Sequence, residues 1–208
     1  MHHTNQKRAF LPSHMLALLV KYMIIPTVAA FLLAGCVSST DGNSKSIVQE
    51  LIQNYPELKG KTYESDTVQR VVDGDTFVTK SGHKVRLIGV NTPETHGKVQ
   101  YYGKEASQFT KEQLTGKQVY LFSDTGNTDK YGRLLRYVFI HNHSQMFNET
   151  LVTEGYANAM TIPPNVMYAE HFVQLERKAR KHKKGLWGSD KNELKPSRTP
   201  SHAKTSGH

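Results

Sequence analysis

The sequence predicts an α+β fold, a mainly β domain built as a five-stranded barrel with three α-helices. Three observations support this prediction. Residues 67–90 alternate β-branched and polar side chains around two turn signals, which is typical of antiparallel strands. A segment with helical spacing follows, and two further strand-like runs come after it. Two more helical segments end the region, so the expected order is three strands, a helix, two strands and two helices.

The strands are expected where apolar residues alternate between turn signals. TVQRVVDGDTFVTKSGHKVRLIGV contains the turn pairs Asp73-Gly74 and Ser81-Gly82, which favour two or three antiparallel strands. Residues 119–121 and 135–139 predict two more strands, one on each side of the polar hairpin SDTGNTDKYGR. Among common architectures, the five-stranded barrel of the oligonucleotide-binding (OB-fold) type matches this pattern most closely.

The helices are expected where apolar residues recur every three or four positions. KEASQFTKEQLTGK, residues 104–117, predicts a helix that ends at Gly116. Residues 147–155 predict a short helix that also ends at a glycine. Residues 168–182 carry a longer apolar stripe, and Tyr168 at its start is therefore expected in the core.

The charge of the chain favours a polyanionic partner without proving one. The 208 residues carry a formal net charge of +9. Nucleic acid, an anionic membrane surface and simple solubility would each account for this excess. The single cysteine excludes an internal disulfide and any metal site built from several cysteines.

The N-terminal region has the layout of a secretory signal. Three basic residues precede the apolar run MIIPTVAAFLLAGC, and Leu33-Ala34-Gly35-Cys36 resembles a bacterial lipobox. That resemblance implies a lipoprotein signal peptide over residues 1–35, a lipid anchor of the palmitate type on Cys36, and an exported domain held at the cell membrane outside the cytoplasm. The alternative is an uncleaved transmembrane anchor, for which the run is short.

The rest of the chain divides by composition. Residues 36–62 are mostly polar and are expected to form a tether with one short helix. Residues 63–188 are expected to form the folded domain. Residues 189–208 have no apolar period and are rich in Ser, Pro, Lys and His, which is typical of a disordered tail.

Three polar clusters stand at the ends of the predicted strands. They are DGDT at residues 73–76, the run from Arg86 through NTPE at 91–94, and TDKYGR at 128–133. Taken singly, they could be a β-turn, a strand end and a charged hairpin loop. Taken together, they supply what phosphodiester hydrolysis needs. Arginine forks pair with phosphate oxygens, carboxylate and carbonyl oxygens hold a hard cation, and a carboxylate accepts a proton from water.

The segments that carry these clusters resemble the thermonuclease (staphylococcal-nuclease-like) family. VVDGDTF, RLIGVNTPE, YGKEAS, TDKYGR and a final GLW occur in the family's order, and the resemblance spans residues 67–187. It implies an OB-fold barrel with three helices. It also implies a calcium-dependent endonuclease that hydrolyses DNA and RNA outside the cell or at its surface and leaves 3′-phosphates.

The resemblance also implies roles for individual residues. The expected calcium ligands are Asp75, Asn91 and the backbone carbonyl of Thr92. The expected catalytic residues are Arg86 and Arg133, which would bind the scissile phosphate, and Glu94, which would position or deprotonate the attacking water. The expected substrate-binding residues, on a neighbouring phosphate, are Lys130 and Tyr131.

Two departures from the family pattern change what is expected. Asn91 stands where the best-known members have a second aspartate ligand, so the site has one negative charge fewer and should bind calcium more weakly. AMTIPPNVMY, residues 159–168, lacks the tyrosines that border the nucleotide base in those members. The base preference is therefore not predicted.

Two other functions fit part of the sequence. A non-catalytic nucleic-acid-binding OB-fold lipoprotein would explain the fold and the charge, although such a protein has no need of both arginines and Glu94. A basic lipoprotein that adheres to the envelope would explain the charge and the lipobox but not the three clusters. A monomer with DNA or RNA substrates is the leading expectation.

Overall fold

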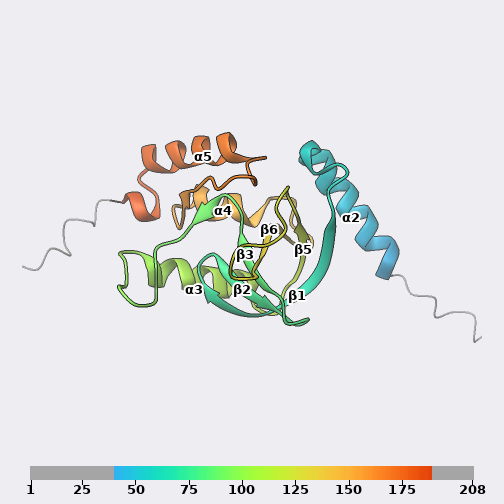
Figure 1. The fold of residues 1–208 in the computed structure, drawn as a ribbon. Helices are drawn as coiled ribbons and strands as arrows, with labels where there is room; N and C mark the ends of the chain where they lie inside the picture. Colours follow the sequence, from blue (N-terminus) through green and yellow to red (C-terminus); the bar gives the residue numbers. More distant parts are fainter. Residues whose placement is uncertain (1–39, 189–208) are drawn as a thin grey trace, which may run out of the picture. The chain divides into compact units, whose positions relative to one another are not determined.

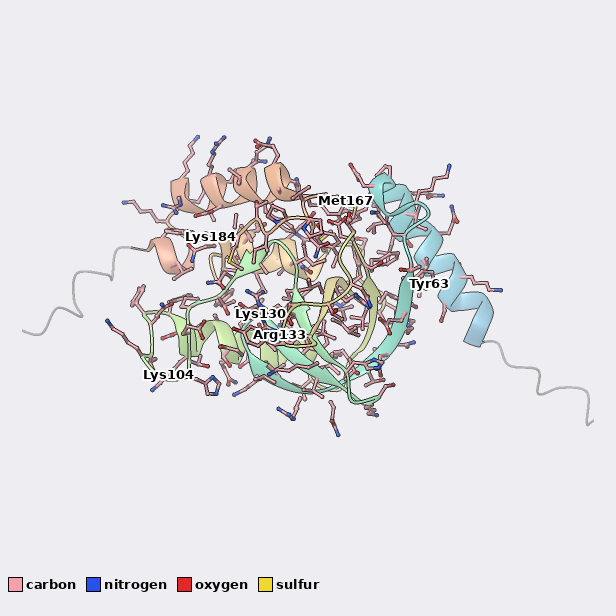
Figure 2. The ribbon with its side chains drawn as sticks, in the orientation of Figure 1. Tyr63, Lys104, Lys130, Arg133, Met167 and Lys184 are labelled. Carbon is pink, nitrogen blue, oxygen red and sulfur yellow. The ribbon has the colours of Figure 1, made fainter. Side chains whose placement is uncertain are left out.

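The computed structural model describes residues 40–188, with side chains from residue 44 (Figures 1 and 2). The predicted signal peptide, Cys36 and the predicted tail from residue 189 lie outside this range. The chain divides into two units, residues 1–45 and 46–208, and the description below concerns the second. Within the described range, no helix has the length and apolar character needed to cross a membrane.

A closed five-stranded barrel forms the centre of this unit, which confirms the predicted fold class. Neighbouring strands run antiparallel except for one parallel pair, β3 with β6. Two short strands outside the barrel, β4 (Val90–Asn91) and β7 (Asn158–Ala159), pair with each other. The barrel strands, in their order around it, are β1 (Tyr63–Asp73), β2 (Thr76–Thr79), β3 (Lys84–Leu87), β6 (Leu134–Ile140) and β5 (Gln118–Phe122).

The three predicted helices are present beside the barrel. α3 (Gly103–Leu114) follows β4 and contacts β1, with Ala106 and Leu114 fully buried. α4 (Phe147–Thr153) contacts β6, and α5 (Ala169–Lys181) packs on α4 (Figure 1). A 3₁₀ turn, η2 (Gly185–Trp187), follows α5. Tyr168 is buried at the start of α5, as its place in the apolar stripe predicted.

The described residues contain a fourth helix, where the sequence suggested a tether with one short helix. α2 (Thr40–Asn54) is 15 residues long and is followed by the 3₁₀ turn η1 (Pro56–Leu58). Val48, Leu51 and Leu58 are buried in the same hydrophobic cluster as the barrel residues. The apolar residues of this segment recur at i, i+3 and i+4, so one face of the helix can pack on the core. Residues 47–58 are thus part of the compact unit and do not form a free tether.

The turn that follows β3 requires glycine. Gly89 has a φ of +79°, and a side chain there would collide with the ring of Phe172 on α5. Its carbonyl oxygen accepts a hydrogen bond from the N–H of Met160. Because the chain turns here without a side chain, the end of β3 lies close to α5 and to the segment that follows β7.

Candidate active site

A cavity of about 560 Å³ opens where the ends of β1, β3 and β4 meet the loop before β6. The three polar clusters, far apart in sequence, all contribute to its lining. The predicted site residues that line it are Asp75, Arg86, Asn91, Glu94, Lys130, Tyr131 and Arg133. Thr92 is buried directly behind this surface, in contact with Asp75.

The β1–β2 turn is held between two other elements. Thr110 of α3 donates a hydrogen bond from Oγ1 to the carbonyl oxygen of Gly74, at 2.7 Å. A Cβ on Gly74 would lie only 2.7 Å from the side chain of Thr92, so no larger residue fits at this turn. The turn therefore presents Asp75 in one position, fixed by α3 on one side and by the residues after β4 on the other.

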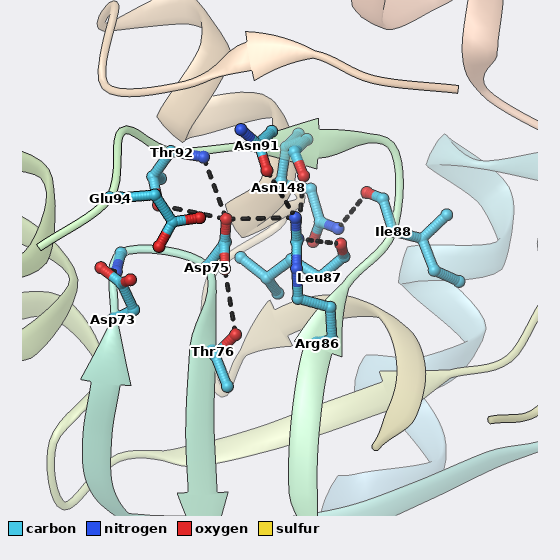
Figure 3. Close-up of polar contacts among 12 residues, drawn as sticks. Asp73, Asp75, Thr76, Arg86, Leu87, Ile88, Asn91, Thr92, Glu94 and Asn148 are labelled. Carbon is cyan, nitrogen blue, oxygen red and sulfur yellow. Dashed lines mark hydrogen bonds and ion pairs between the residues drawn. The ribbon is translucent and has the colours of Figure 1, made fainter. Parts of the chain in front are cut away.

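Asp75 is almost fully enclosed by hydrogen-bond donors (Figure 3). Its Oδ2 accepts bonds from the N–H and the Oγ1 of Thr92, at 2.9 and 3.1 Å. Its Oδ1 accepts a bond from Oγ1 of Thr76, at 3.0 Å. The sequence predicted Thr92 only as a carbonyl ligand, whereas in the structure its N–H and hydroxyl groups orient the neighbouring carboxylate.

Arg86 is the cation that Asp75 faces. One guanidinium nitrogen, Nη2, lies 3.2 Å from Asp75 Oδ2 and donates to Asn91 Oδ1 at 3.0 Å. The other, Nη1, donates to the carbonyl oxygens of Leu87 and Val90 at 2.7 and 2.8 Å (Figure 3). These four contacts hold the guanidinium plane rigidly at the floor of the cavity.

Burial is the main influence on the ionisation of Arg86. It lowers the pKa of the guanidinium, the carboxylate of Asp75 raises it, and the second cation, Arg133, lowers it further. An arginine guanidinium stays protonated in proteins at neutral pH. Arg86 and Arg133 both line the cavity, where an anion would relieve the repulsion between them.

Asn91 serves as a neutral acceptor beside this pair. Its Oδ1 receives the bond from Arg86, and its backbone lies opposite Asn158 in the β4–β7 pairing. The cluster formed by Asp75, Arg86 and Asn91 therefore has one negative and one positive charge. A carboxylate at position 91 would give it a net negative charge.

A buried asparagine that the sequence did not reveal fixes the end of β3. Asn148 of α4 is fully buried and donates from Nδ2 to the carbonyl oxygens of Ile88 and Arg136, at 2.9 and 3.3 Å. Its Oδ1 accepts the N–H of Val138 at 2.9 Å. Asn148 thus ties the turn after β3 to β6. In FNETLV, an asparagine directly after Phe147 was the one available sign of this role.

The loop before β6 is organised by Asp129. Its Oδ1 accepts the N–H groups of Tyr131 and Arg133, at 2.9 and 3.0 Å, and its Oδ2 accepts Nε of Arg133 at 2.6 Å. Desolvation alone would raise the pKa of Asp129, but the bonds from the backbone and side chain of Arg133 and from Tyr131 outweigh it and hold the pKa below its usual value. Asp129 was not among the predicted site residues, and its spacing of four residues from Arg133 is the one sequence signal that could have found it.

The other charged groups of this loop surround an exposed ring. Tyr131 is 71% exposed. Lys130 Nζ lies 5.1 Å, and the central guanidinium carbon of Arg133 5.4 Å, from the centre of its ring. The loop therefore offers two cations and one aromatic face at the mouth of the cavity, a combination suited to a phosphate chain with bases.

Glu94 lines the cavity from the opposite side and is exposed to solvent. Its backbone is fixed by two bonds with Gln100: Gln100 N–H donates to Glu94 O at 3.0 Å, and Glu94 N–H donates to Gln100 Oε1 at 3.1 Å. Among residues 44–188, no side chain or backbone group bonds to the Glu94 carboxylate. This carboxylate is therefore free to accept a proton from a bound water.

The remaining wall is formed by residues 160–165, part of the segment that departs from the thermonuclease pattern. Met160, Ile162, Pro163 and Pro164 make it apolar. The buried Asn165 ties it to the loop before β6: its Oδ1 accepts the N–H of Gly126 at 2.7 Å, and its Nδ2 donates to Gly126 O at 3.2 Å. The cavity thus has a charged floor and one apolar side, and the sequence analysis assigned no residue to that side.

The oxygen atoms at the floor fit a hard cation. Asp75 offers a carboxylate and Asn91 an amide oxygen, both at the cavity surface, with Thr92 adjacent. Calcium prefers oxygen donors of these kinds. In the part of the chain with described side chains, no three His, Cys, Asp or Glu residues form a metal-binding group. A cation here would consequently depend on one carboxylate and on neutral oxygens.

Comparison with known proteins agrees with this geometry. A family model described as staphylococcal nuclease homologue matches residues 84–189. The chain is 45% identical over 128 residues to a thermonuclease of Staphylococcus hyicus, covering 59% of this chain and 75% of the relative. It is 44% identical over 137 residues to a thermonuclease of Staphylococcus intermedius, covering 63% and 79%. An endonuclease of Bacillus subtilis is 40% identical over 129 residues, covering 58% of this chain and 60% of the relative.

Proposed function

This chain belongs to the staphylococcal nuclease homologue family, and from that premise we propose that it is a calcium-dependent nuclease that cleaves DNA and RNA at the cell surface and leaves 3′-phosphates. It is a hydrolase of the endonuclease type. The observation that carries the proposal is the shared cavity: Arg86, Arg133 and Glu94, which come from three separate segments, line one space.

The residues of this cavity can perform hydrolysis at phosphorus. Glu94 accepts a proton from water while the water oxygen attacks phosphorus, and the bond from phosphorus to the 5′ oxygen breaks. The leaving 5′ oxygen takes a proton from solvent. Arg86 and Arg133, which both line the cavity, pair with the phosphate oxygens as negative charge increases on them. We propose that Arg133 also acts on the leaving oxygen. Both Nη atoms of Arg86 already contact protein oxygens, so a phosphate would pair with Nε or take the place of some of these contacts.

Calcium is the cofactor we propose, held by Asp75, Asn91 and the carbonyl of Thr92. When bound, it would neutralise phosphate charge and help to orient the phosphate. Two observations bear on its affinity. Asp75 forms an ion pair with Arg86 and Asn91 accepts a hydrogen bond from it, so a cation would share these oxygens with the guanidinium. Asn91 adds no charge of its own. We infer a calcium site of lower affinity than one with two carboxylates.

The substrate is proposed to enter along the loop before β6. Lys130 and Tyr131 would contact a neighbouring phosphate, since both line the cavity and Tyr131 is exposed. The apolar wall would face a base, because the one polar side chain by which residues 160–165 line the cavity is Asn165, whose amide is already bonded to Gly126. Contacts to phosphates and to an apolar wall do not distinguish deoxyribose from ribose, so both DNA and RNA are proposed as substrates.

The location of the enzyme is a separate proposal that rests on the sequence. The lipobox-like motif before Cys36 supports a lipoprotein signal at residues 1–35 and a lipid anchor that holds the domain outside the cytoplasm. Labelling of expressing cells with a radioactive fatty acid tests it: the chain should be labelled and Cys36→Ser should not. A labelled Cys36→Ser variant, or an unlabelled parent, would contradict the anchor.

The enzymatic proposal is tested by cleavage of single- and double-stranded DNA and of RNA with calcium and then with chelator. We expect calcium-dependent cleavage and products that a 3′-phosphatase can trim. Glu94→Gln should keep nucleic-acid binding and lose turnover. Binding without cleavage by the parent chain would instead identify a non-catalytic nucleic-acid-binding module.

A further inference from the structure

A stack of five aromatic rings extends from the core to the surface beside Glu94. From outside to inside, the ring centres lie 5.7, 5.6, 4.2 and 6.3 Å apart, with interplanar angles of 41°, 27°, 14° and 9°. The rings, in the same order, belong to Tyr101, Tyr102, Tyr156, Phe109 and Phe147. No part of the proposed catalytic cycle uses them.

The two ends of this ring stack differ. Phe147 is buried in α4, where it belongs to the hydrophobic core. Tyr101 and Tyr102 are only partly buried, and among the described residues the sole ring that contacts Tyr101 is that of Tyr102. Core packing accounts for the inner rings. It does not account for a second tyrosine at the outer end, which covers little and leaves part of its ring in water.

The outer end of the stack is fixed to the active site through the backbone. Gln100, directly before Tyr101, makes two hydrogen bonds with the backbone of Glu94. Gly103, directly after Tyr102, packs so closely that a Cβ would lie 2.6 Å from the Glu94 carbonyl oxygen. The residues on both sides of the two tyrosines therefore contact Glu94, the residue that we propose as general base.

The backbone of Tyr102 has a conformation that is unusual for a large side chain. Its φ is +67°, in the left-handed region that bulky residues rarely adopt. Tyr102 directly precedes α3, and in this conformation its ring stacks on that of Tyr156. Such conformations persist where the surroundings impose them, and they are concentrated at functional sites.

The charge around the two rings suits a polyanion. Lys98 and Lys104 are exposed on either side of them, while Glu105 belongs to the first turn of α3. Figure 2 shows Lys104 on the same side of the molecule as α3, with Lys130 and Arg133 nearer the centre and Tyr63 beyond them. Since Gln100 and Gly103 contact the backbone of Glu94, a substrate strand that extends beyond Glu94 could reach the segment that carries the two rings and these lysines.

We propose that Tyr101 and Tyr102 form a stacking platform for one unpaired base of a single-stranded nucleic acid, beyond the nucleotides that flank the scissile phosphate. This inference rests on the proposed nuclease function. A base in a duplex is already stacked and paired, so the platform favours single strands. A dinucleotide has no base other than the two that flank the cleaved bond, so it cannot use the platform. A 12-mer has further bases and can use it.

The test compares kcat/KM for single-stranded dT12 and for the dinucleotide dTpdT, using the full chain. Tyr101→Ala should lower kcat/KM for dT12 about tenfold through KM, since base–aromatic stacking contributes affinity of this order, and should leave dTpdT within about twofold. Tyr101→Phe keeps the ring and should behave as the parent. Tyr63→Ala is the matched control, because Tyr63 is an exposed tyrosine of β1 that stacks on Phe122.

A second measurement does not depend on turnover. Photocrosslinking of a 12-mer with 5-bromodeoxyuridine at each position in turn should label Tyr101 or Tyr102 at one main position.

Equal losses of kcat/KM with dT12 and dTpdT in Tyr101→Ala would show that the ring only positions Glu94, and no loss with either would show that it does not contact substrate. Both results overturn the platform while leaving the nuclease intact. A parent chain that cleaves neither substrate overturns the proposed function as well.

Discussion

Arg86 and Asp75 form an ion pair of 3.2 Å between two side chains whose exposure is 9% and 10%. Both are also held by other groups: Thr92 bonds the carboxylate, and the carbonyls of Leu87 and Val90 bond the guanidinium. A buried pair of this kind is expensive to break, because the remaining charge stays in a medium of low polarity.

Replacement of Arg86 should affect both stability and activity. Arg86→Ala leaves Asp75 buried without its cation, so we expect a loss of about 3 kcal/mol in the free energy of unfolding. Arg86→Lys keeps the charge but cannot bond Asp75, Asn91 and two carbonyls together, so we expect at least about a hundredfold loss in kcat. Urea unfolding and steady-state kinetics measure the two effects. Arg70→Lys, on the exposed face of β1, is the control. An Arg86→Lys enzyme with parental kcat would contradict the role of the fork.

Asn91→Asp should restore the negative charge that the neutral amide lacks. The new carboxylate would lie beside Asp75 and Arg86, where Oδ1 of Asn91 now accepts the bond from Nη2. Calcium affinity should rise about tenfold, because each added carboxylate ligand strengthens attraction for the cation. The maximum rate should stay close to that of the parent. Calcium titration by calorimetry measures the affinity without turnover. An unchanged dissociation constant would show that position 91 does not contact the cation.

Asp129→Asn should disorder the loop that carries Arg133. The pKa of Asp129 is below its usual value in the folded state. Its carboxylate therefore stabilises the fold at pH values above the unfolded pKa of about 4. This contribution is lost as the pH falls through the lower pKa of the folded state. The parent should therefore lose more stability than the variant as the pH falls below about 4. At neutral pH the variant should have a higher KM, because Nε of Arg133 loses its 2.6 Å partner. If the free energy of unfolding of the two proteins fell equally with pH below about 4, this assignment would be contradicted.

Leu51→Ala tests whether α2 belongs to the compact unit. Leu51 is 1% exposed within the core cluster. Its truncation should cost about 2–5 kcal/mol in the free energy of unfolding, the usual range for a leucine deleted from a core. Glu50→Ala, on the exposed side of the same helix, should change stability by less than about 0.5 kcal/mol. Chemical denaturation of both variants measures the difference. Equal stability of the two would mean that residues 46–54 act as a tether.

The sequence by itself determined the elements and the chemistry available at their ends. Alternation around Asp73-Gly74 and Ser81-Gly82 predicted antiparallel strands, and apolar spacing predicted α3, α4 and α5. The order of the motifs was specific enough to indicate the family. These signals are readable because strand and helix periods are local, and because a carboxylate or an arginine keeps its chemistry wherever the chain places it.

Only the tertiary structure decided which of these groups meet. Thr92 reaches Asp75 across 17 residues and Asn148 reaches Ile88 across 60. The parallel pairing of β3 with β6 sets Arg86 opposite Leu135, and both residues line the cavity. The packing of α2, the wall at residues 160–165 and the stack at Tyr101 have the same origin. A contact between distant segments depends on how the barrel closes, and no local period in the sequence records that closure.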